Sequence, residues 1–487
     1  MNPNIGINDL ILVSPMIALF LASLVPITLK VLRGNREQNA LSTLIQGLIG
    51  LVISAVLLGI FSGPNGATAF HHSLVFDGIT QWMGVIALAA TAGALVLMYE
   101  NPATKGMQFS ELVFLTLSSA LGMLILVSAA DLLMIFIGLE LMSLALYLMI
   151  GMSHEEKLAK EASLKYFILG GFSSAIFLYG TAFVFGSTGS TNILDFLEEA
   201  RNLIVTNRLF LFGITFVVVG FCFKVSIAPF HAWTPDVYQG APTPLSGFMA
   251  TAVKTVSFAA FLRIIATRSL EGSQNLFDVL QWLAVITMLV GNTAAILQDN
   301  LKRMIAYSSV AHSGYILVGV ITAGVSEVGA FGGSAVIFYL ISYAFMTMGA
   351  FAIVSMLENS ENAIINVDDL AGLAKKRPVL ALCFTLFLLS LAGIPPTVGF
   401  FGKFYLFNAA IGEGLLWLAI WGMISSVIAL YYYLRPVVVM YMKEGEAELA
   451  GHSLNATTVT VLISAICIIL LGLISGPIFT AVEKSLM

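Results

Sequence analysis

Charged residues are scarce in this 487-residue sequence, where Asp, Glu, Lys and Arg together make up 10% of the chain. A soluble protein of average composition has about 25% charged residues. Apolar residues instead account for 59% of the chain, and the mean hydropathy is +0.96. This composition excludes a soluble globular enzyme and a disordered chain. The net charge of −5 leaves no basic stripe for phosphates, which excludes a nucleic-acid binder.

Cysteine is equally scarce: Cys222, Cys383 and Cys467 each lie inside an apolar run. Their spacing fits neither a disulfide framework nor a zinc or iron–sulfur motif. The sequence also has no P-loop, and no GxGxxG follows a strand-like run. We therefore expect no metal, flavin, nicotinamide or ATP site in this chain. An ion gradient or a partner subunit is the expected driving force.

Long apolar runs, by contrast, fill most of the sequence. A membrane-spanning helix needs roughly 20 predominantly apolar residues, and the linkers between the runs are too short to hold a soluble domain. We therefore predict one all-α polytopic transmembrane domain over residues 1–487, with about 14 transmembrane helices. The predicted helices span residues 8–29, 40–62, 76–99, 110–129, 131–151, 163–187, 208–237, 244–266, 278–298, 303–323, 330–357, 378–409, 414–440 and 457–482.

The positive charges predict the orientation of the chain. The first run ends in Lys30, Arg33 and Arg36, with no small-residue cleavage site before it, so we interpret it as a retained helix. Most lysines and arginines lie in the links after odd-numbered runs, and cytoplasmic links carry the excess of these residues. This bias predicts that both termini lie on the outer side of the membrane.

Proline and glycine interrupt two of the runs. Pro229 follows Lys224 in the seventh run, and the stretch Gly393–Pro396 precedes Lys403 in the twelfth. Proline removes a backbone donor and clashes with the preceding turn. A broken helix at membrane depth is tolerated only where the freed backbone is buried or lines a cavity. We therefore expect helices 7 and 12 to be broken, a pattern typical of an ion path.

The two breaks lie five helices apart, which predicts two repeats formed by helices 4–8 and helices 9–13. Because five is odd, the second repeat enters the membrane from the opposite side, so the repeats have inverted topology. The first repeat covers residues 110–266 and the second covers residues 278–440. Residues 1–109 form helices 1–3, and residues 457–487 form helix 14.

Four charged residues lie within the apolar runs: Glu140, Lys224, Lys254 and Lys403. A rise of about 1.5 Å per residue places Glu140 and Lys254 near the bilayer midplane. A charge at a helix centre there costs about 2.5–3.5 kcal/mol. Burial lowers the pKa of a lysine toward neutral, and a nearby carboxylate holds it charged, so such residues can relay protons. A structural ion pair between Glu140 and a lysine is the alternative.

Further polar candidates accompany this row. His312 shares a helix face with Ser309 and Ser313, and a histidine can shuttle protons because its unperturbed pKa is about 6.5. Hydrogen bonding within the helix packing is the alternative for His312. Lys165 and His231 lie nearer the inner side and can connect the row to the cytoplasm, with ordinary inner-side charge and helix capping as the alternatives. The candidates for proton translocation are therefore Glu140, Lys224, Lys254, Lys403, His312, Lys165, His231 and Lys302, the last with a topology signal as its alternative.

Three segments resemble the antiporter-like membrane subunits of respiratory complex I: FKVSIAPFHAWTPDVYQGAPTPLSGFMATAVKTVSFAAFLR, GNTAAILQDNLKRMIAYSSVAHSGYILVG and AGIPPTVGFFGKFYLF. The resemblance runs from about helix 2 to helix 13. It implies fourteen helices in two inverted repeats, with helices 7 and 12 broken. It also implies that Glu140 pairs with Lys224 and that Lys254 links onward to Lys403. The other positions that match the path are His312, Lys165 and His231.

This resemblance implies a proton-translocating subunit of NADH-quinone oxidoreductase, which couples electron transfer from NADH to quinone in other subunits to proton pumping. NADH, FMN, iron–sulfur clusters and quinone are then expected in partner subunits, with no cofactor in this chain. The expected partners are other membrane subunits, including neighbouring antiporter-like subunits, and the lipid bilayer. A subunit of a multisubunit cation/proton antiporter is the alternative. Charges buried at the midplane are not expected in an inert scaffold subunit. The sequence also has no selectivity motif of the kind expected in a solute transporter.

Overall fold

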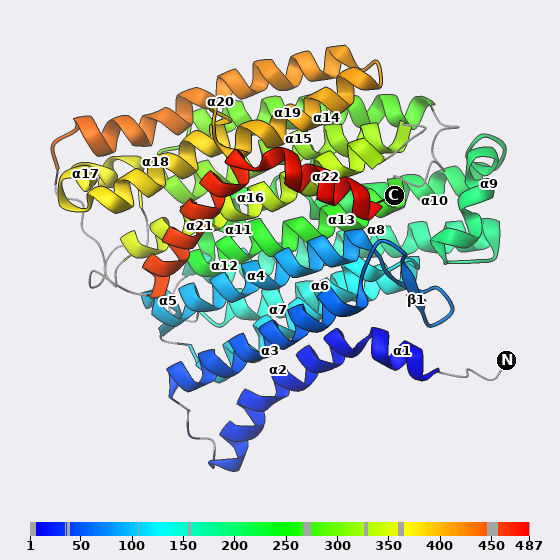
Figure 1. Cartoon of the computed structure of the whole chain (residues 1–487), viewed down its shortest axis with the longest axis horizontal. Coiled ribbons are helices and arrows are strands. Elements are labelled where there is room, and N and C mark those ends of the chain that lie inside the picture. The colour runs from blue at the N-terminus through cyan, green and yellow to red at the C-terminus, as the bar shows by residue number, and fades with distance from the viewer. Residues whose placement is uncertain are drawn as a thin grey trace.

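The computed structural model of the chain describes residues 6–34, 36, 39–105, 107–153, 157–265, 274–325, 330–358, 365–445 and 456–486. Helices form nearly all of the described backbone. The long helices run in roughly one common direction, so that their ends form two opposite faces of the molecule (Figure 1). Apolar runs of this length become helices because a helix satisfies its backbone N–H and C=O groups internally, without water.

The helices of the first half follow the predicted runs, with additional helices over residues 102–105 and 193–206 that were not predicted. Val13 separates two helices in the first run, and the seventh run is divided after Lys224. The helices are α1 (Ile7–Leu12), α2 (Ser14–Leu32), α3 (Ala40–Phe61), α4 (Gly78–Glu100), α5 (Pro102–Lys105), α6 (Phe109–Ser128), α7 (Leu132–Gly151), α8 (Lys157–Thr188), α9 (Ile193–Thr206), α10 (Arg208–Lys224), α11 (Trp233–Gly240), α12 (Thr243–Phe248), the π-helix η1 (Met249–Val253) and α13 (Lys254–Ile265).

The second half also follows the predicted runs, except that the twelfth run is divided after Ala392 and the fourteenth, predicted as one helix, is divided at Ile474. The helices are α14 (Gln274–Ile296), α15 (Leu301–Val325), α16 (Ala330–Leu357), the 3-10 helix η2 (Val367–Leu370), α17 (Leu373–Lys376), α18 (Pro378–Ala392), α19 (Val398–Gly412), α20 (Leu416–Met442), α21 (Ala456–Leu473) and α22 (Ser475–Leu486). Within the described residues, 12 helices are long and apolar enough to cross a membrane. The divided seventh and twelfth runs are not among these.

A small hairpin departs from the all-helical expectation. Its strands β1 (Ala67–Ala69) and β2 (Leu74–Phe76) pair antiparallel. The residues Phe70–His72 at its tip have positive φ, and Asn192 Nδ2 donates a hydrogen bond to the His72 carbonyl at 3.2 Å. Strands of three residues are too short to show the alternation from which a strand is predicted.

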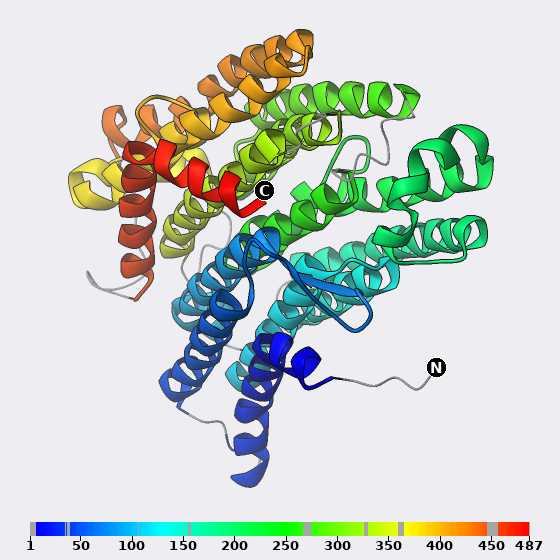
Figure 2. The same ribbon diagram turned by 45° about the vertical axis from the view of Figure 1, so that its right-hand side comes forward.

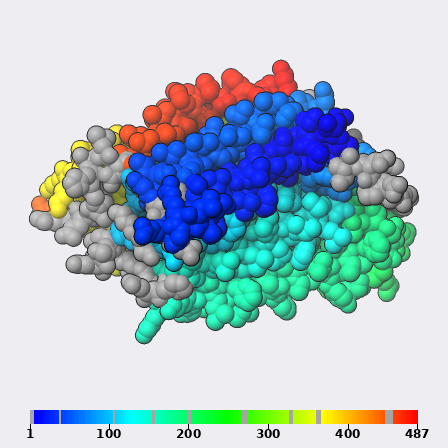
Figure 3. All heavy atoms as spheres, turned by 90° about the horizontal axis from the view of Figure 1, so that it is seen from below, coloured from blue at the N-terminus to red at the C-terminus, as the bar shows by residue number. Residues whose placement is uncertain are grey.

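The chain crosses the molecule from one flank to the other. The helices α2 and α3 lie at one flank, α19 and α20 lie at the opposite flank, and α12 to α16 lie between them (Figures 1 and 2). From below, the N-terminal helices cover the middle of the surface, with the C-terminal helices along one edge and the helices near residues 130–200 along the other (Figure 3). The helices α12 to α16, which form the middle of the chain, are therefore enclosed between the helices of the two flanks.

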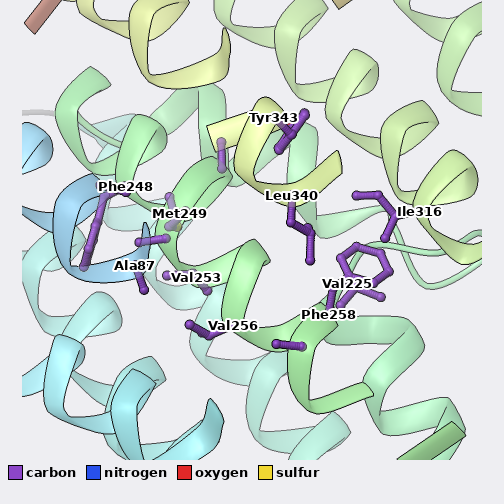
Figure 4. Packing of buried hydrophobic residues seen from close by; sticks show 14 of the residues in the cluster. Ala87, Val225, Phe248, Met249, Val253, Val256, Phe258, Ile316, Leu340 and Tyr343 are labelled. Atoms are coloured by element: carbon purple, nitrogen blue, oxygen red, sulfur yellow. The ribbon is translucent and has the colours of Figure 1, made fainter. Parts of the chain in front are cut away.

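Three spans at the centre, α12 to α13, α15 and α16, are almost entirely buried. Their apolar side chains, among them Val253, Ile316 and Leu340, gather with Ala87 of α4 in the interior (Figure 4). A helix that is apolar all round is one that is buried on every side. Polar groups on these three helices are therefore surrounded by protein rather than by lipid.

The break after α10 is a helix-terminating Schellman motif. Ser226 has a φ of +63°, its N–H donates to the Phe223 carbonyl at 3.1 Å, and Ile227 N–H donates to the Cys222 carbonyl at 2.8 Å. A left-handed residue followed by this pair of bonds satisfies carbonyls that a helix end otherwise leaves free. The helix thus ends at Lys224, and the hydrogen bonds of this motif satisfy the carbonyl groups of its last turn.

The break after α18 has the same geometry. Gly393 has a φ of +88°, its N–H donates to the Ser390 carbonyl at 3.0 Å, and Ile394 N–H donates to the Leu389 carbonyl at 3.0 Å. Glycine adopts this left-handed conformation at no steric cost. The structure therefore contains both of the breaks that proline and glycine predicted in helices 7 and 12.

Candidate proton-transfer site

Lys224 is the last residue of α10, and its side chain reaches α7 and α8. Its Nζ donates hydrogen bonds to Ser143 Oγ at 2.6 Å and to Tyr166 Oη at 3.2 Å. The carbonyl dipoles at a helix C-terminus favour a cation there. Close packing fixes α10 against α8, because a Cβ at Gly180 would lie 2.7 Å from the Gly213 carbonyl oxygen.

Glu140 on α7 does not contact Lys224 directly. Its Oε1 accepts a hydrogen bond from Ser174 Oγ of α8, and none of the ion pairs among the described residues joins it to a lysine. A serine contacts each of these two side chains, Ser174 for Glu140 and Ser143 for Lys224. A cavity of about 20 Å³ is lined by Ser143, Ser174 and Lys224, and a cavity of this size has room for one water molecule.

Lys254 begins α13 directly after the π-helical turn η1. Single π-helical turns within α-helices occur frequently at functional sites. Its Nζ donates hydrogen bonds to both the carbonyl and the hydroxyl oxygen of Ser309, each at 2.5 Å. The Tyr343 ring centre lies 5.4 Å from the same nitrogen. The side chain of Lys254 is 3% exposed, so its ammonium group is enclosed at the centre of the bundle.

His312 is held between two phenol groups. Its Nδ1 lies 2.6 Å from Tyr339 Oη, and its Nε2 lies 2.9 Å from Tyr433 Oη. Tyr433 Oη also shares a hydrogen bond with Ser308 Oγ. The histidine is therefore hydrogen-bonded within the helix packing, and the same hydroxyl groups extend the polar row away from it.

Lys403 on α19 reaches back to the end of α18. Its Nζ donates a hydrogen bond to the Ala392 carbonyl at 2.9 Å and lies 4.8 Å from the centre of the Tyr315 ring. The side chain is 5% exposed. The amine of Lys403 thus meets the carbonyl end of α18, whereas Lys224 is itself the last residue of α10 and directs its amine to α7 and α8.

The helix α15 connects these groups. Ser309 accepts the hydrogen bonds of Lys254, and Ser313 Oγ donates to the Val225 carbonyl, next to Lys224, at 2.5 Å. Three residues after His312, the Tyr315 ring packs against both His312 and Lys403. One buried helix therefore brings the surroundings of Lys224, Lys254 and Lys403 together.

The close approach of Gly393 to Lys403 leads to a prediction. A Cβ on Gly393 would lie 3.0 Å from Lys403 Cδ, and the left-handed backbone there costs a non-glycine residue about 1–2 kcal/mol. We expect Gly393→Ala to lower the thermal stability of the assembled complex and to reduce its proton translocation. Gly171→Ala is the matched control, because an added Cβ there meets no atom within 4 Å. Equal melting temperatures and pumping rates for the two variants would contradict this role of Gly393.

Lys165 and His231 lie apart from the row formed by Lys224, Lys254, His312 and Lys403. Lys165 is 42% exposed and pairs with Glu161 at 2.6 Å and with Asp236 at 3.0 Å. Arg303 binds the other Asp236 oxygen at 2.7 Å. His231 lies in the break after α10, where its Nδ1 is buried without a hydrogen-bond partner. No hydrogen bond or ion pair among the described residues links either side chain to Lys224.

Lys302 is a buried residue and not a surface charge. Its side chain is 4% exposed, and its Nζ lies 3.0 Å from Glu358 Oε1. Sequence analysis missed Glu358, which directly follows the apolar residues of α16. A useful signal was present, since Glu358 directly follows the predicted span 330–357 and Lys302 directly precedes the predicted span 303–323. Two consecutive antiparallel helices bring these two ends to the same side of the membrane.

Among the described residues, no group of three or more His, Cys, Asp or Glu side chains is placed to hold a metal ion. Cys222 and Cys383 are buried, and Cys467 is partly buried. The polar groups that the structure brings together here are amines, an imidazole, hydroxyl groups and a carboxylate.

A family model described as "NADH:quinone oxidoreductase/Mrp antiporter, TM" matches residues 129–429, a region that contains every lysine of the buried row. NADH-quinone oxidoreductase subunit N of Bdellovibrio bacteriovorus is 74% identical over 487 residues and is covered over 100% of both chains. The subunit N of Trichlorobacter lovleyi is 40% identical over 440 residues, which cover 90% of this chain and 89% of that protein.

Solved structures agree with these sequence relationships. A chain of respiratory complex I from Thermus thermophilus with bound aureothin has a TM-score of 0.82 and 30% identity, covering 96% of this chain and 99% of that one. A chain of the Mrp complex from Dietzia sp. has a TM-score of 0.78 at 19% identity, covering 98% and 95%, and shows a shared fold alone. The chain therefore belongs to the NADH:quinone oxidoreductase/Mrp antiporter family of membrane proteins, alongside the subunit N members of NADH-quinone oxidoreductase.

Proposed function

We propose that protons cross the membrane in this chain along Glu140, Lys224, Lys254, His312 and Lys403. The chain is a proton-translocating membrane subunit of NADH-quinone oxidoreductase, a translocase complex. One observation carries the proposed route: the three lysines are held by hydroxyl and carbonyl oxygens rather than by direct contact with a carboxylate. An amine with neutral partners can lose and regain a proton, whereas a carboxylate partner would hold it charged.

The order of the groups follows their positions in the fold. Glu140 and Lys224 begin the row on α7 and α10, Lys254 continues it from the centre, and His312 leads to Lys403. Ser143, Ser309 and Ser313 supply the hydroxyl groups between these side chains. Lys403 is the outermost member and passes protons toward the periplasm. Lys165 and His231 lie on the inner side, and they exchange protons between Lys224 and the cytoplasm.

The division into two repeats is part of this proposal. Residues 110–266 and residues 278–440 each contain a half-helix that ends in a Schellman motif, and each motif lies next to a lysine of the proposed route. The inverted topology of the two repeats makes Lys403 the counterpart of Lys224. A route built from two such halves opens toward opposite sides of the membrane.

The chain spans the bacterial inner membrane many times, and we place both termini on the periplasmic side. Support for this orientation comes from charge: the ends of the helices that carry Lys165, Lys302 and Arg303 are the lysine- and arginine-rich ends of the molecule. Positive residues of that kind accumulate on the cytoplasmic side.

A neighbouring membrane subunit covers the flank of α7 in this proposal. Glu140 is only partly buried, and it lies on the same stripe of α7 as Ile137 and Leu144, which are 47% and 46% exposed. A carboxylate facing lipid at this depth is costly, and contact with an adjacent antiporter-like subunit removes the cost. NADH, FMN, iron–sulfur clusters and quinone are bound by other partner subunits.

The relatives favour this function over that of a cation/proton antiporter subunit. The curated relatives between 37% and 74% identity carry the name NADH-quinone oxidoreductase subunit N. The similarity to the Mrp complex lies at 19% identity and concerns the fold.

Replacing Lys254 tests the route. Lys254→Met keeps most of the side-chain volume and removes the amine, so we expect NADH-driven proton translocation to fall by roughly tenfold or more, as for loss of an acid–base group. The measurement uses sealed membrane vesicles with a pH-sensitive dye and parallel quinone reduction. Lys443→Met is the matched control, because Lys443 pairs with Asp368 and is 56% exposed. Normal pumping by an assembled Lys254→Met complex would remove Lys254 from the route.

A further inference from the structure

A second carboxylate, Glu358, is buried where four helices meet. It follows α16 and is 4% exposed. Its Oε1 accepts hydrogen bonds from Lys302 Nζ of α15, at 3.0 Å, and from Thr243 Oγ1 of α12. Its Oε2 accepts a hydrogen bond from Asn101 Nδ2, at the end of α4, at 2.9 Å. Asn101 is in turn fixed by Ser355 Oγ at 2.8 Å. Both carboxylate oxygens are therefore satisfied without water.

Stability alone does not explain this arrangement. Removing two charges from water costs several kcal/mol for each ion, and apolar residues of similar volume are often as stable as a buried pair. Among the described residues, Lys302 is the charged group that contacts Glu358. The amine's other partner is neutral, the Ala241 carbonyl oxygen at 3.1 Å.

The position of the pair connects water with the buried row. Asp299 lies three residues before Lys302, just outside α15, and its side chain is 79% exposed, so the chain reaches the surface of the molecule within three residues of the pair. In the other direction, Ser309 lies seven residues after Lys302, which puts both on one face of α15 at a separation of about 10 Å along the axis. Ser309 holds the ammonium group of Lys254.

We propose that Glu358 is a proton-loading group that, with Lys302, supplies Lys254 from the cytoplasmic side. This inference rests on the proposed function of Lys254. The ionised Glu358 takes a proton from water and becomes a neutral acid, which releases Lys302 from its ion pair. Lys302 then gives one proton to the neutral amine of Lys254. The proton on Glu358 moves across the hydrogen bond to Lys302 and restores the ion pair. The net result is one proton moved from the cytoplasmic water to Lys254.

The test uses the whole complex in sealed vesicles. Glu358→Gln keeps the shape of the side chain but cannot load a proton, so we expect proton translocation to fall by roughly tenfold or more. Thr243→Val removes a hydrogen bond to Glu358 and keeps the carboxylate, and we expect it to retain more than half of the wild-type rate. A purely structural ion pair would make the loss of pumping follow the loss of assembled complex on native gels. Wild-type pumping by an assembled Glu358→Gln complex would overturn the inference.

A spectroscopic measurement decides the case in which Glu358→Gln does not assemble. Infrared difference spectra of the working wild-type complex should contain a carboxylic-acid C=O band, and this band should shift in Glu358→Asp. An unshifted band in an active Glu358→Asp complex would show that Glu358 stays ionised and would overturn the inference. Lys254→Met, measured in parallel, separates the two proposals. Normal pumping by that variant contradicts the proposed function, whereas its failure beside a normal Glu358→Gln complex contradicts only the loading role.

Discussion

Lys403→Arg is expected to lose most NADH-driven proton translocation even though it keeps the positive charge. Arginine stays protonated where a buried lysine can release its proton. The surroundings of Lys403 suit such release, because its Nζ is held by the Ala392 carbonyl and the Tyr315 ring, and no carboxylate is among these partners. We expect a decrease of roughly tenfold or more, the effect of removing an acid–base group. Lys403→Ala should be at least as damaging, since it removes both the charge and the proton.

The measurement compares the two variants in sealed vesicles, with quinone reduction recorded in parallel and assembly checked on native gels. Arginine is larger than lysine, so a homologous control at an exposed site, Lys443→Arg, reports any general effect of the exchange. If Lys403→Arg pumps like the wild type, Lys403 acts as a fixed charge. The release step then belongs elsewhere, with His312 as the next candidate because phenol groups contact both of its ring nitrogens.

Glu140→Gln and Lys224→Ala are each expected to remove most proton pumping and to slow the coupled redox reaction. Glutamine can still accept the Ser174 hydrogen bond, so Glu140→Gln removes the charge while leaving the local contact in place. Lys224→Ala removes the amine that Ser143 and Tyr166 hold. Glu140 contacts Ser174 and Lys224 contacts Ser143 and Tyr166, so neither side chain occupies the place of the other.

The control for this pair is Ser174→Ala, which removes the hydroxyl group next to Glu140 and keeps both charges. We expect it to lower proton translocation much less than Glu140→Gln does. Pumping rates, redox rates and the amount of assembled complex are measured for all three variants. Wild-type pumping in both Glu140→Gln and Lys224→Ala, with normal assembly, would reduce the two residues to a structural role.

The helical spans could be predicted because their cause is local. A run of apolar residues long enough to cross a bilayer must satisfy its own backbone, and only a helix does so within one segment. The breaks were also predictable, since Pro229 and Gly393 alter the backbone at their own positions. The hairpin of β1 and β2 was not predictable, because its short strands depend on contacts such as that of Asn192 with the His72 carbonyl.

Charge partners were harder to predict than the charges themselves. Glu140 and Lys224 were both identified, but they do not contact each other in the structure. Glu140 binds Ser174, Lys224 binds Ser143, and both serines line a small cavity. Lys302 resembled a topology signal because it lies at a helix end. Its burial against Glu358 depends on how α12, α15, α16 and the end of α4 meet, and the sequence of any one helix does not contain that information.

The sequence by itself determined that this is a membrane protein of many helices, that two of those helices are broken, and which charged residues lie within the apolar runs. These properties follow from composition, from segment length and from residues that act on their own backbone. Only the tertiary structure decided which oxygen atoms the buried amines reach: Ser143 for Lys224, Ser309 for Lys254, the Ala392 carbonyl for Lys403 and Glu358 for Lys302. Hydrogen bonds act over about 3 Å, so residues distant in the chain become partners only when whole helices pack in one particular arrangement.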